Sequence, residues 1–307
     1  MRTTRAKESR AETTRGRTTR AETTRVRTSR GRTTRTLRPG ARGLLTGLLT
    51  ALFLAPFYLM LRNALMDAQS LTAPHWTWWP ATPHWENFSA LFADPALHMG
   101  AALGNSLLVA AVTAPVSTLL ASAAGYGLAR IPVPGRGVVL GLVVATLMIP
   151  GSVTFVPTFV VVGSMGGVNT LWGVIAPGLF NPFAVLLFRN FYLQFPREIE
   201  EAGRLDGLGR LGLYRRIALP SSGAMLASLG ALAFIDSWNS FLWPLVIGQD
   251  PSAWTAQIAL STFLTSQTIN LPGLFAGAVV TIAPLVVMFL VAQRYIVEGI
   301  ATSGLKG

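Results

Sequence analysis

The chain has 307 residues, of which 51% are hydrophobic and only 12% are charged. A soluble domain of this length usually carries about a quarter charged residues, so the composition argues against a soluble enzyme and predicts a protein that uses a lipid bilayer as its solvent. Cysteine is absent, which excludes disulfide bonds and thiolate metal sites.

The net charge of +12 comes almost entirely from the N-terminus. Residues 1–42 hold 13 Arg and one Lys against three Glu, a net charge of +11. Residues 1–36 are a degenerate repeat of Thr-Thr-Arg units with almost nothing apolar to bury, so we expect 1–42 to form a disordered cytoplasmic tail and to bind no nucleic acid. A tether to anionic membrane lipid is one interpretation. An orientation signal without further role and a translation start assigned too far upstream are the alternatives.

Six stretches are long enough to cross a membrane, which takes about 20 apolar residues in a helix. Because backbone polar groups must be paired inside a bilayer, we expect these stretches to be helical. The predicted fold is therefore an all-α integral membrane protein with six transmembrane helices. The stretches are 43–61, 99–129, the two halves of 137–188 divided at the glycines of 163–167, 222–247, and 274–293.

The basic residues predict the orientation of these spans. With six spans, both termini share one side with the loops 130–136 and 189–221, and that side holds 24 of the 25 basic residues. The exception is Arg62, at a membrane edge. The protein is therefore predicted to lie in the cell membrane with both termini in the cytoplasm. The first span could be a signal peptide, but its apolar run is longer than a usual signal core and no clear cleavage site follows, which favours an uncleaved anchor.

The segment 74–85, on the predicted outer side, concentrates four of the eight Trp residues together with His75 and His84. Histidines beside aromatic rings could form a metal site or a sugar-stacking site. Tryptophan at this depth more often anchors a protein at the lipid interface, and the segment has no acidic cluster and no His-x-x-x-His spacing. We therefore expect an interfacial anchor and no metal site.

The longest interior loop, 196–220, is predicted to form a helix, a turn and a second short helix. Acidic residues follow Pro196 in the first turn, where the helix dipole favours them. Ile199, Ala202 and Gly203 form a narrow face of mostly small side chains, and Gly207 can close the helix in a left-handed conformation. The second helix is expected to stop at Pro220. Composition alone leaves open whether this loop docks another protein or lies on the lipid surface.

The residues of this loop resemble the conserved loop of ABC-importer permeases, which reads Glu-Ala-Ala, three residues, Gly, nine residues, Ile-x-Leu-Pro. The one departure is Gly203, where that pattern has Ala; Gly weakens a helix by about 1 kcal/mol. The residues that the resemblance assigns to coupling with an ATPase are Glu201, Ala202, Gly203, Asp206, Gly207, Ile217, Leu219 and Pro220.

Further motifs resemble the carbohydrate-uptake branch of these permeases, similar to the second membrane subunit of the maltose importer. They are Asn105-Ser106, the segment 126–130, Pro134-Gly135-Arg136, Met148-Ile149-Pro150, Asn169-Thr170, the segment 238–244, Gln293-Arg294-Tyr295 and the terminal segment 304–307. Together they cover about 99–307, so the basic tail lies outside the resemblance.

The resemblance implies a type I ABC importer permease architecture and a transport subunit without catalytic residues, metal or cofactor. It implies a heterodimer with a second permease, two ATP-binding cassette ATPase subunits, an extracytoplasmic binding protein and a sugar substrate. The first span and outer loop would occupy 43–98, the permease domain 99–297 and a cytoplasmic tail 298–307, whose contact with the ATPases the resemblance also suggests. Neither of the two lysines lies in a phosphate-binding GxxxxGK[ST] loop, so ATP hydrolysis is assigned to the separate ATPases.

Inside the fifth span, Asp236 is the residue that most needs an explanation. A carboxylate at this depth costs about 2.5–3.5 kcal/mol on insertion scales, so it should face a cavity or a partner helix. Asn239 lies three residues on and Trp238 lies nearby, which would suit a sugar path; a packing contact with the partner permease explains them equally well. Kinks are predicted at Pro150, Pro177, Pro182 and Pro284.

Two other functions are compatible with parts of this pattern. The solute could be something other than a sugar, such as glycerol 3-phosphate, but a phosphate would need buried basic residues that the spans of this chain lack, although a partner could supply them. A membrane-embedded enzyme would need paired carboxylates, a His cluster or a nucleophile with its base, and Asp236 alone does not meet that requirement.

Overall fold

The computed structural model describes residues 39–265 and 270–304. Within these ranges the regular secondary-structure elements are all helices, joined by turns and loops. The predicted basic tail, up to residue 38, and the terminal residues 305–307 lie outside the described residues. The described residues divide into two units, with the boundary between Ala51 and Leu52. The second unit contains the elements on which the functional argument depends.

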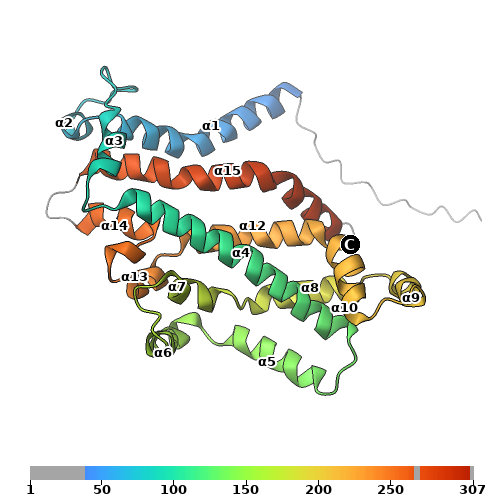
Figure 1. Ribbon diagram of the computed structural model, residues 1–307. Coiled ribbons are helices and arrows are strands. Elements are labelled where there is room, and N and C mark those ends of the chain that lie inside the picture. The colour runs from blue at the N-terminus through green and yellow to red at the C-terminus, as the bar shows by residue number, and fades with distance from the viewer. Residues whose placement is uncertain (1–38, 266–269, 305–307) are drawn as a thin grey trace, which may run out of the picture. The chain divides into compact units, whose positions relative to one another are not determined.

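Figure 1 shows the helices in chain order. They are α1 (Pro39–Ala64), α2 (Ala68–Thr72), α3 (Glu86–Ala93), α4 (Met99–Arg130), α5 (Arg136–Met148), α6 (Gly151–Ser164), α7 (Leu171–Gly178), α8 (Pro182–Leu193), α9 (Arg197–Leu205), α10 (Arg210–Leu213), the π-helical turn η1 (Tyr214–Ala218), α11 (Leu219–Ser221), α12 (Gly223–Asn239), α13 (Leu242–Ile247), the 3-10 turn η2 (Pro251–Ala253), α14 (Ala256–Thr265) and α15 (Leu271–Gly304).

The membrane spans are of two kinds. Helices α1, α4 and α15 are each long and apolar enough to cross a bilayer unbroken. Three bent helix pairs are further candidates for a crossing: α5 with α6 at 105°, α7 with α8 at 42°, and α10–α11 with α12 at 76°. The all-α membrane fold is therefore confirmed, and the predicted count of six is reached when each bent pair is one span.

Three of the predicted spans, the third, fourth and fifth, are not single helices. The third breaks at Ile149-Pro150, where both residues are extended, because proline disfavours a helical conformation in the residue before it. The fifth was expected to run through 222–247, but α12 ends at Asn239 and Ser240 is extended before α13 begins. Apolar length predicts that a segment lies in the membrane, but it does not show where the helix is interrupted.

The other predicted proline positions behave differently from one another. Pro177 lies in α7 and Pro182 starts α8, on either side of a break that Asn181 caps by accepting a hydrogen bond from the Ala184 amide. Pro284 lies inside α15, which continues as one helix to Gly304. The helix therefore extends past residue 298, where the C-terminal tail was expected to begin.

Helix α4 is the central helix of the second unit: it packs along α8 on one side and α12 on the other, and α12 in turn packs on α15 (Figure 1). Its buried face is rich in Ala, Ser and Thr, which allows close approach of neighbouring helices. Gly125 marks the closest point, because a Cβ atom there would lie 2.6 Å from Cβ of Phe188 and 2.8 Å from the Arg189 amide nitrogen. The contact between α4 and α8 therefore requires glycine at this position.

We expect Gly125→Ala to destabilise the protein by about 1–3 kcal/mol, because the added methyl meets backbone that cannot move without separating α4 from α8. Gly127→Ala is the matched control: it lies in the same helix, and a Cβ atom there meets nothing within 4 Å. That change should be neutral or stabilising by up to about 1 kcal/mol. Thermal unfolding in detergent measures both, and equal effects would contradict the close contact.

Several helices carry apolar side chains on their exposed surfaces. On α5 these include Val138, Val139 and Leu142, and on α6 Val153 and Val156. Apolar side chains exposed at this density are expected on a surface that faces lipid or a partner subunit. The exposed surface of this chain is thus suited to membrane surroundings.

Candidate functional site

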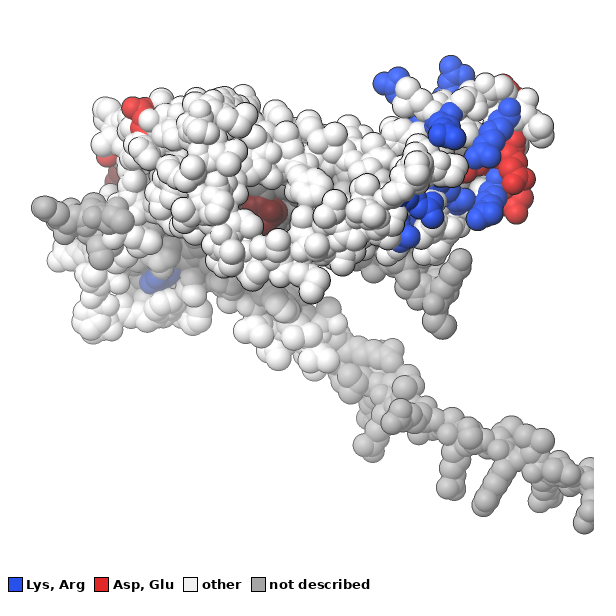
Figure 2. All heavy atoms as spheres, turned by 90° about the horizontal axis from the view of Figure 1, so that it is seen from below, with Lys and Arg blue, Asp and Glu red and all other residues white. Residues whose placement is uncertain are grey.

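Most basic residues of the described part of the second unit gather at one end of it. Figure 2 shows most of the Lys and Arg atoms crowded there with acidic atoms among them, over the region of α9 and α10. Arg130 ends α4 and Arg136 begins α5, next to this loop region. Arg62, by contrast, lies near the end of α1. The predicted arrangement of six spans places the loops 130–136 and 189–221 on the same side. The position of these basic residues at one end agrees with that arrangement.

Helix α9 is the first part of the predicted coupling loop. It begins after Pro196, carries Glu198 and Glu200 in its first turn and ends at Leu205, with Asp206 as the C-terminal cap. Gly207 follows with φ of +83°, a left-handed conformation that favours glycine. The predicted helix and its glycine stop are therefore confirmed.

The exposed face of α9 differs from the predicted one. Gly203 is buried against the side chains of Ile217 and Leu213. These side chains are so close that a Cβ atom at residue 203 would lie 2.6 Å from Cδ1 of Ile217 and 2.8 Å from Cδ2 of Leu213. The side of α9 that carries Gly203 therefore points toward the second half of the loop. Because glycine lacks the methyl group of alanine, the two halves of the loop can pack closely. The outward face instead consists of Ile199, which is 44% exposed, Ala202, and Leu205, which is 90% exposed.

The second half of the loop does not stop at Pro220. Helix α10, η1 and α11 run on continuously to Ser221. Within this run the amide of Leu219 donates to the carbonyl of Tyr214, five residues back, in a π-helical turn. The wider turn accommodates Pro220, which has no amide hydrogen and would crowd the carbonyl four residues before it. Ile217 and Leu219 are half-buried, and Pro220 is exposed.

A buried ion pair joins α9 to α4. Nε of Arg130 lies 3.5 Å from Oε1 of Glu200, and both side chains are almost inaccessible to solvent. The same guanidinium donates to the carbonyl oxygens of Tyr192, at 2.7 Å, and Phe195. Arg130 thus ties three segments together: α4, the end of α8 and α9. The sequence pattern pointed to Glu201, which is exposed, and missed Glu200.

A hydroxyl cluster fixes the second half of the loop to the bundle. The phenol of Tyr192 is 2.7 Å from Oγ of Ser122 and 3.0 Å from Oγ of Ser222, and Tyr214 donates to Ser122 at 3.2 Å. The ring of Tyr126 packs against those of Tyr192 and Tyr214 at centroid distances of 5.3 and 5.2 Å. Movement of the loop would therefore be transmitted directly to α4, α8 and α12.

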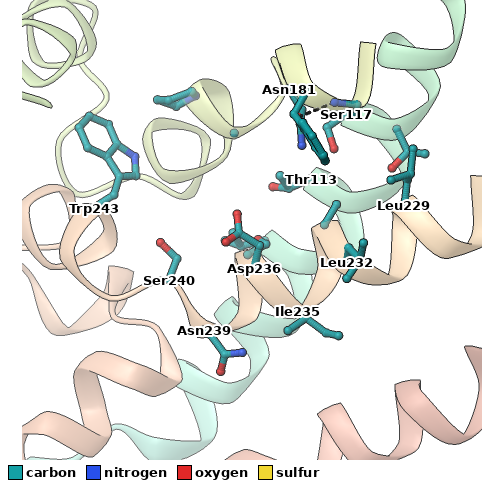
Figure 3. A pocket seen from close by; sticks show the side chains of 18 of the residues that line it. Thr113, Ser117, Asn181, Leu229, Leu232, Ile235, Asp236, Asn239, Ser240 and Trp243 are labelled. Atoms are coloured by element: carbon teal, nitrogen blue, oxygen red, sulfur yellow. Dashed lines mark hydrogen bonds between the residues drawn. The ribbon is translucent and has the colours of Figure 1, made fainter. Parts of the chain in front are cut away.

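A cavity of about 970 Å³ opens among α4, α7, α8, α12 and α13. Its polar lining residues include Thr113, Ser117, Asn181, Asp236, Asn239 and Ser240. Aromatic rings of Phe183 and Trp243 also line it. Figure 3 shows the Asp236 carboxylate directed into the cavity, with Ser240 and Thr113 on either side of it.

Two of the three predicted path residues lie on this cavity, and the third does not. Asp236 and Asn239 line it, although the amide of Asn239 points away from the carboxylate (Figure 3). Trp238 is fully buried instead: its Nε1 donates to the carbonyl of Thr281 in α15, and its ring stacks on Phe234. It holds α12 against α15 and does not serve as an aromatic platform.

Trp243 supplies the aromatic surface that was expected from Trp238. Its Nε1 donates to the carbonyl of Gly173 at 3.1 Å, and its ring meets Phe155 edge-on at 5.6 Å. These contacts fix the ring in one orientation on the cavity wall. The break after Asn239 redirects the chain so that Trp243 reaches the cavity, and this break was not predicted.

The Trp-rich segment 74–85 is held to α1 by Arg62. The guanidinium donates to the backbone and side-chain oxygens of Thr77 and lies 4.2 Å from the ring centroid of Trp76. The rings of Trp76, Trp78 and Trp85 stay largely exposed. Among residues that the structure describes, no group of three or more His, Asp or Glu could hold a metal ion.

Two carboxylates outside the membrane spans have lowered pKa values that follow from local capping. The pKa of Asp67 is lowered by a hydrogen bond from Ser70 at the start of α2, and that of Asp250 by a hydrogen bond from Ser252 at the start of η2. Both side chains accept hydrogen bonds from amides in the first turn, as N-caps do. These shifts indicate structural roles.

Comparison with known proteins decides the family. The family described as "Binding-protein-dependent transport system inner membrane component" matches residues 117–302. The chain belongs to this family. It is therefore a multi-pass membrane permease subunit of an ABC transporter, and the resemblance inferred from the loop and the flanking motifs is confirmed.

Named relatives of this permease include transporters of different solutes. The arabinooligosaccharides transport system permease protein AraQ of Halalkalibacterium halodurans is 37% identical over 228 residues, which cover 74% of this chain and 81% of the relative. The sn-glycerol-3-phosphate transport system permease protein UgpE of Yersinia enterocolitica is 29% identical, over 85% and 94% of the two chains. A bacterial ABC transporter involved in importing the acidic polysaccharide alginate has the same fold, with a TM-score of 0.73, 20% identity, and coverage of 83% of this chain and 95% of its own.

Proposed function

We propose that this permease carries a sugar or oligosaccharide, delivered by an extracytoplasmic binding protein, through the cavity between α4, α8 and α12. The observation that carries the proposal is the lining of that cavity. It combines hydroxyl and amide groups with a carboxylate and a fixed tryptophan ring. Sugar recognition uses such polar groups to orient hydroxyls and an aromatic face to cover the apolar side of the ring.

The alternative solute is a small phosphate ester such as glycerol 3-phosphate, because one relative is named for it. A phosphate favours Arg or Lys in its binding site. The lining of the cavity contains neither residue. The arabinooligosaccharide relative, which is more similar in sequence, supports the sugar.

Work for transport would come from separate ATPase subunits that dock on α9. The exposed side chains of Ile199, Ala202 and Leu205 form an apolar surface on α9 that a partner protein could contact. The Arg130–Glu200 pair and the hydroxyl cluster of Tyr192 connect that face to the helices around the cavity. ATP can shift the permease between two states only if the ATPases bind those states with different affinity. The contacts that join α9 to the helices around the cavity must therefore be rigid, so that a change at the ATPases also changes the cavity.

The complete transporter would contain a second, different permease, two ATPase subunits and the binding protein, with both termini of this chain in the cytoplasm. Reconstitution of that complex in lipid vesicles tests the proposal. We expect ATP hydrolysis to be stimulated by the sugar-loaded binding protein and to drive uptake of that sugar. Stimulation by glycerol 3-phosphate and not by any sugar would favour a phosphate ester as the solute. Labelling of Ala202→Cys from the outer face of intact cells would contradict the orientation, and the natural absence of cysteine makes that thiol the only one in this chain.

The aromatic face of Trp243 gives a specific expectation. Trp243→Ala should lower the rate of sugar uptake by about fivefold, since one aromatic contact contributes on the order of 1 kcal/mol. Trp243→Phe keeps a ring and should retain most of the uptake. Uptake is measured alongside thermal unfolding, because the lost hydrogen bond to Gly173 could also affect folding. Equal uptake in both variants at equal stability would count against stacking.

A further inference from the structure

The carboxylate of Asp236 has no cationic partner on the cavity wall. Neither ion pair found among the described residues involves it, and no Lys or Arg belongs to the cavity lining. Its side chain is exposed to the cavity (Figure 3). A charge at this depth in a membrane protein is costly unless it faces water or a ligand. The cavity therefore carries a local negative charge that no lining residue neutralises.

A second polar group faces the same space without a partner. Thr113 is 7% exposed, and its Oγ1 has no hydrogen-bond partner among the described residues. Its methyl group packs against Gly178, where an added Cβ atom would lie 3.0 Å from it. The hydroxyl is thereby turned toward the cavity (Figure 3). Buried polar groups without a partner are rare, and Oγ1 of Thr113 is such a group in a residue that belongs to the cavity lining.

Asn181 and Ser240 complete the polar lining around the carboxylate. The Oδ1 atom of Asn181 accepts the hydrogen bond that caps α8, which leaves its Nδ2 group as a donor. Ser240 contributes a hydroxyl beside Asp236 (Figure 3). Hydroxyl and amide donors around one acceptor carboxylate match a solute whose hydroxyl groups both donate and accept. They do not supply the guanidinium or ammonium groups that a phosphate, sulfonate or carboxylate needs.

We propose that Asp236 determines the charge class of the solute: the cavity admits uncharged, hydroxyl-rich molecules and excludes anionic ones. This inference rests on the proposed function, because it takes the cavity as the solute path. An anion near Asp236 is repelled by a charge that the protein does not compensate, whereas a neutral polyol can donate hydrogen bonds to it. The relatives do not decide this point, since one is named for a neutral oligosaccharide and another for an anionic phosphate ester.

The natural absence of cysteine allows a test that does not depend on knowing the sugar. In the assembled transporter, Ser240→Cys places one thiol beside Asp236. Its reaction rate is measured with two methanethiosulfonate reagents of similar size, one carrying an ammonium group and one a sulfonate group. Each reagent forms a mixed disulfide with the thiolate and releases methanesulfinate. Any effect of Asp236 on the thiol itself cancels in the ratio of the two rates.

We expect the ratio of the cationic to the anionic rate to be at least about tenfold higher at residue 240 than at the control site, Ser164→Cys on α6, as expected for a unit charge within several ångströms at intermediate dielectric. Adding Asp236→Asn should bring the ratio to within about twofold of the control, and adding Asp236→Lys should invert it. Asn239→Cys provides a second lining position in case Ser240→Cys folds poorly.

The outcomes separate the two proposals. Equal rates for both reagents at residue 240, unchanged by Asp236→Asn, would overturn the charge selectivity while leaving the cavity as a water-filled path. No reaction with either reagent at residues 240 and 239, with normal reaction at residue 164, would show that the cavity is closed to solutes. That result would overturn both the path and the charge selectivity.

Discussion

Leu205→Asp is expected to remove productive docking of the ATPase subunits and to abolish transport while leaving the permease folded. Leu205 is the last residue of α9 and is 90% exposed, so it contributes little to the stability of this chain. An apolar side chain presented at the end of a supported helix is suited to a pocket on a partner. A charge there should weaken ATPase binding by at least about 30-fold, as expected for an interface hot spot.

The measurement is the amount of ATPase that co-purifies with the permease, together with sugar uptake in vesicles. Gln194→Asp is the matched control, because it adds the same charge at an exposed position two residues before the loop, at the end of α8. It should leave both quantities within about twofold of the unmodified protein, since surface changes away from a contact usually have effects below about 0.5 kcal/mol. Normal ATPase retention by Leu205→Asp would contradict docking on this face.

The exposed face of α9 was only partly predictable. Helical spacing placed Ile199, Ala202 and Gly203 on one side, and the first two are exposed. Gly203 turns inward because Leu213 and Ile217 lie within contact distance of it. Leu205 becomes the exposed residue as a consequence. The sequence of a loop gives the periodicity of each helix, but which side is covered depends on how the two helices pack on one another.

The fold shows the same division between local pattern and tertiary arrangement. Helix α4 matches its prediction closely because one uninterrupted apolar run fills it from Met99 to Arg130. The bends are a different matter. Pro150 directly precedes a new helix at 105° to the one before it, whereas Pro284 lies within α15. Proline removes one hydrogen bond in each case, and the surrounding packing decides whether the helix continues.

The cavity residues illustrate what helical geometry adds to a sequence pattern. Trp238 follows Asp236 by two positions, which corresponds to about 200° around a helix, so the two side chains must point in opposite directions. Helical spacing alone therefore separates Trp238 from the face that carries Asp236. The same spacing does not identify Trp243, because the extended residue Ser240 changes the direction of the chain. Thr113 comes from α4, over a hundred positions earlier in the chain.

The buried Arg130–Glu200 pair leads to the second large expected effect. Glu200→Ala should destabilise the protein by about 3–5 kcal/mol, because it leaves the Arg130 guanidinium buried without its counterion. Glu198→Ala is the control: this carboxylate lies in the same first turn of α9 but is exposed, and its loss should cost less than about 0.5 kcal/mol. Thermal unfolding in detergent distinguishes the two.

The pair should also matter for coupling, because Arg130 joins α9 to the carbonyl groups of Tyr192 and Phe195. If α9 is the part that the ATPases move, Glu200→Ala should lower the number of sugar molecules carried per ATP hydrolysed, even at a temperature where the variant is fully folded. Replacing both partners, with Arg130→Met and Glu200→Met, should restore stability toward that of the unmodified protein, since no unpaired charge remains. A double variant that regained stability and full coupling would show that packing alone transmits the movement; stability without coupling would assign that role to the ion pair and the hydrogen bonds of Arg130.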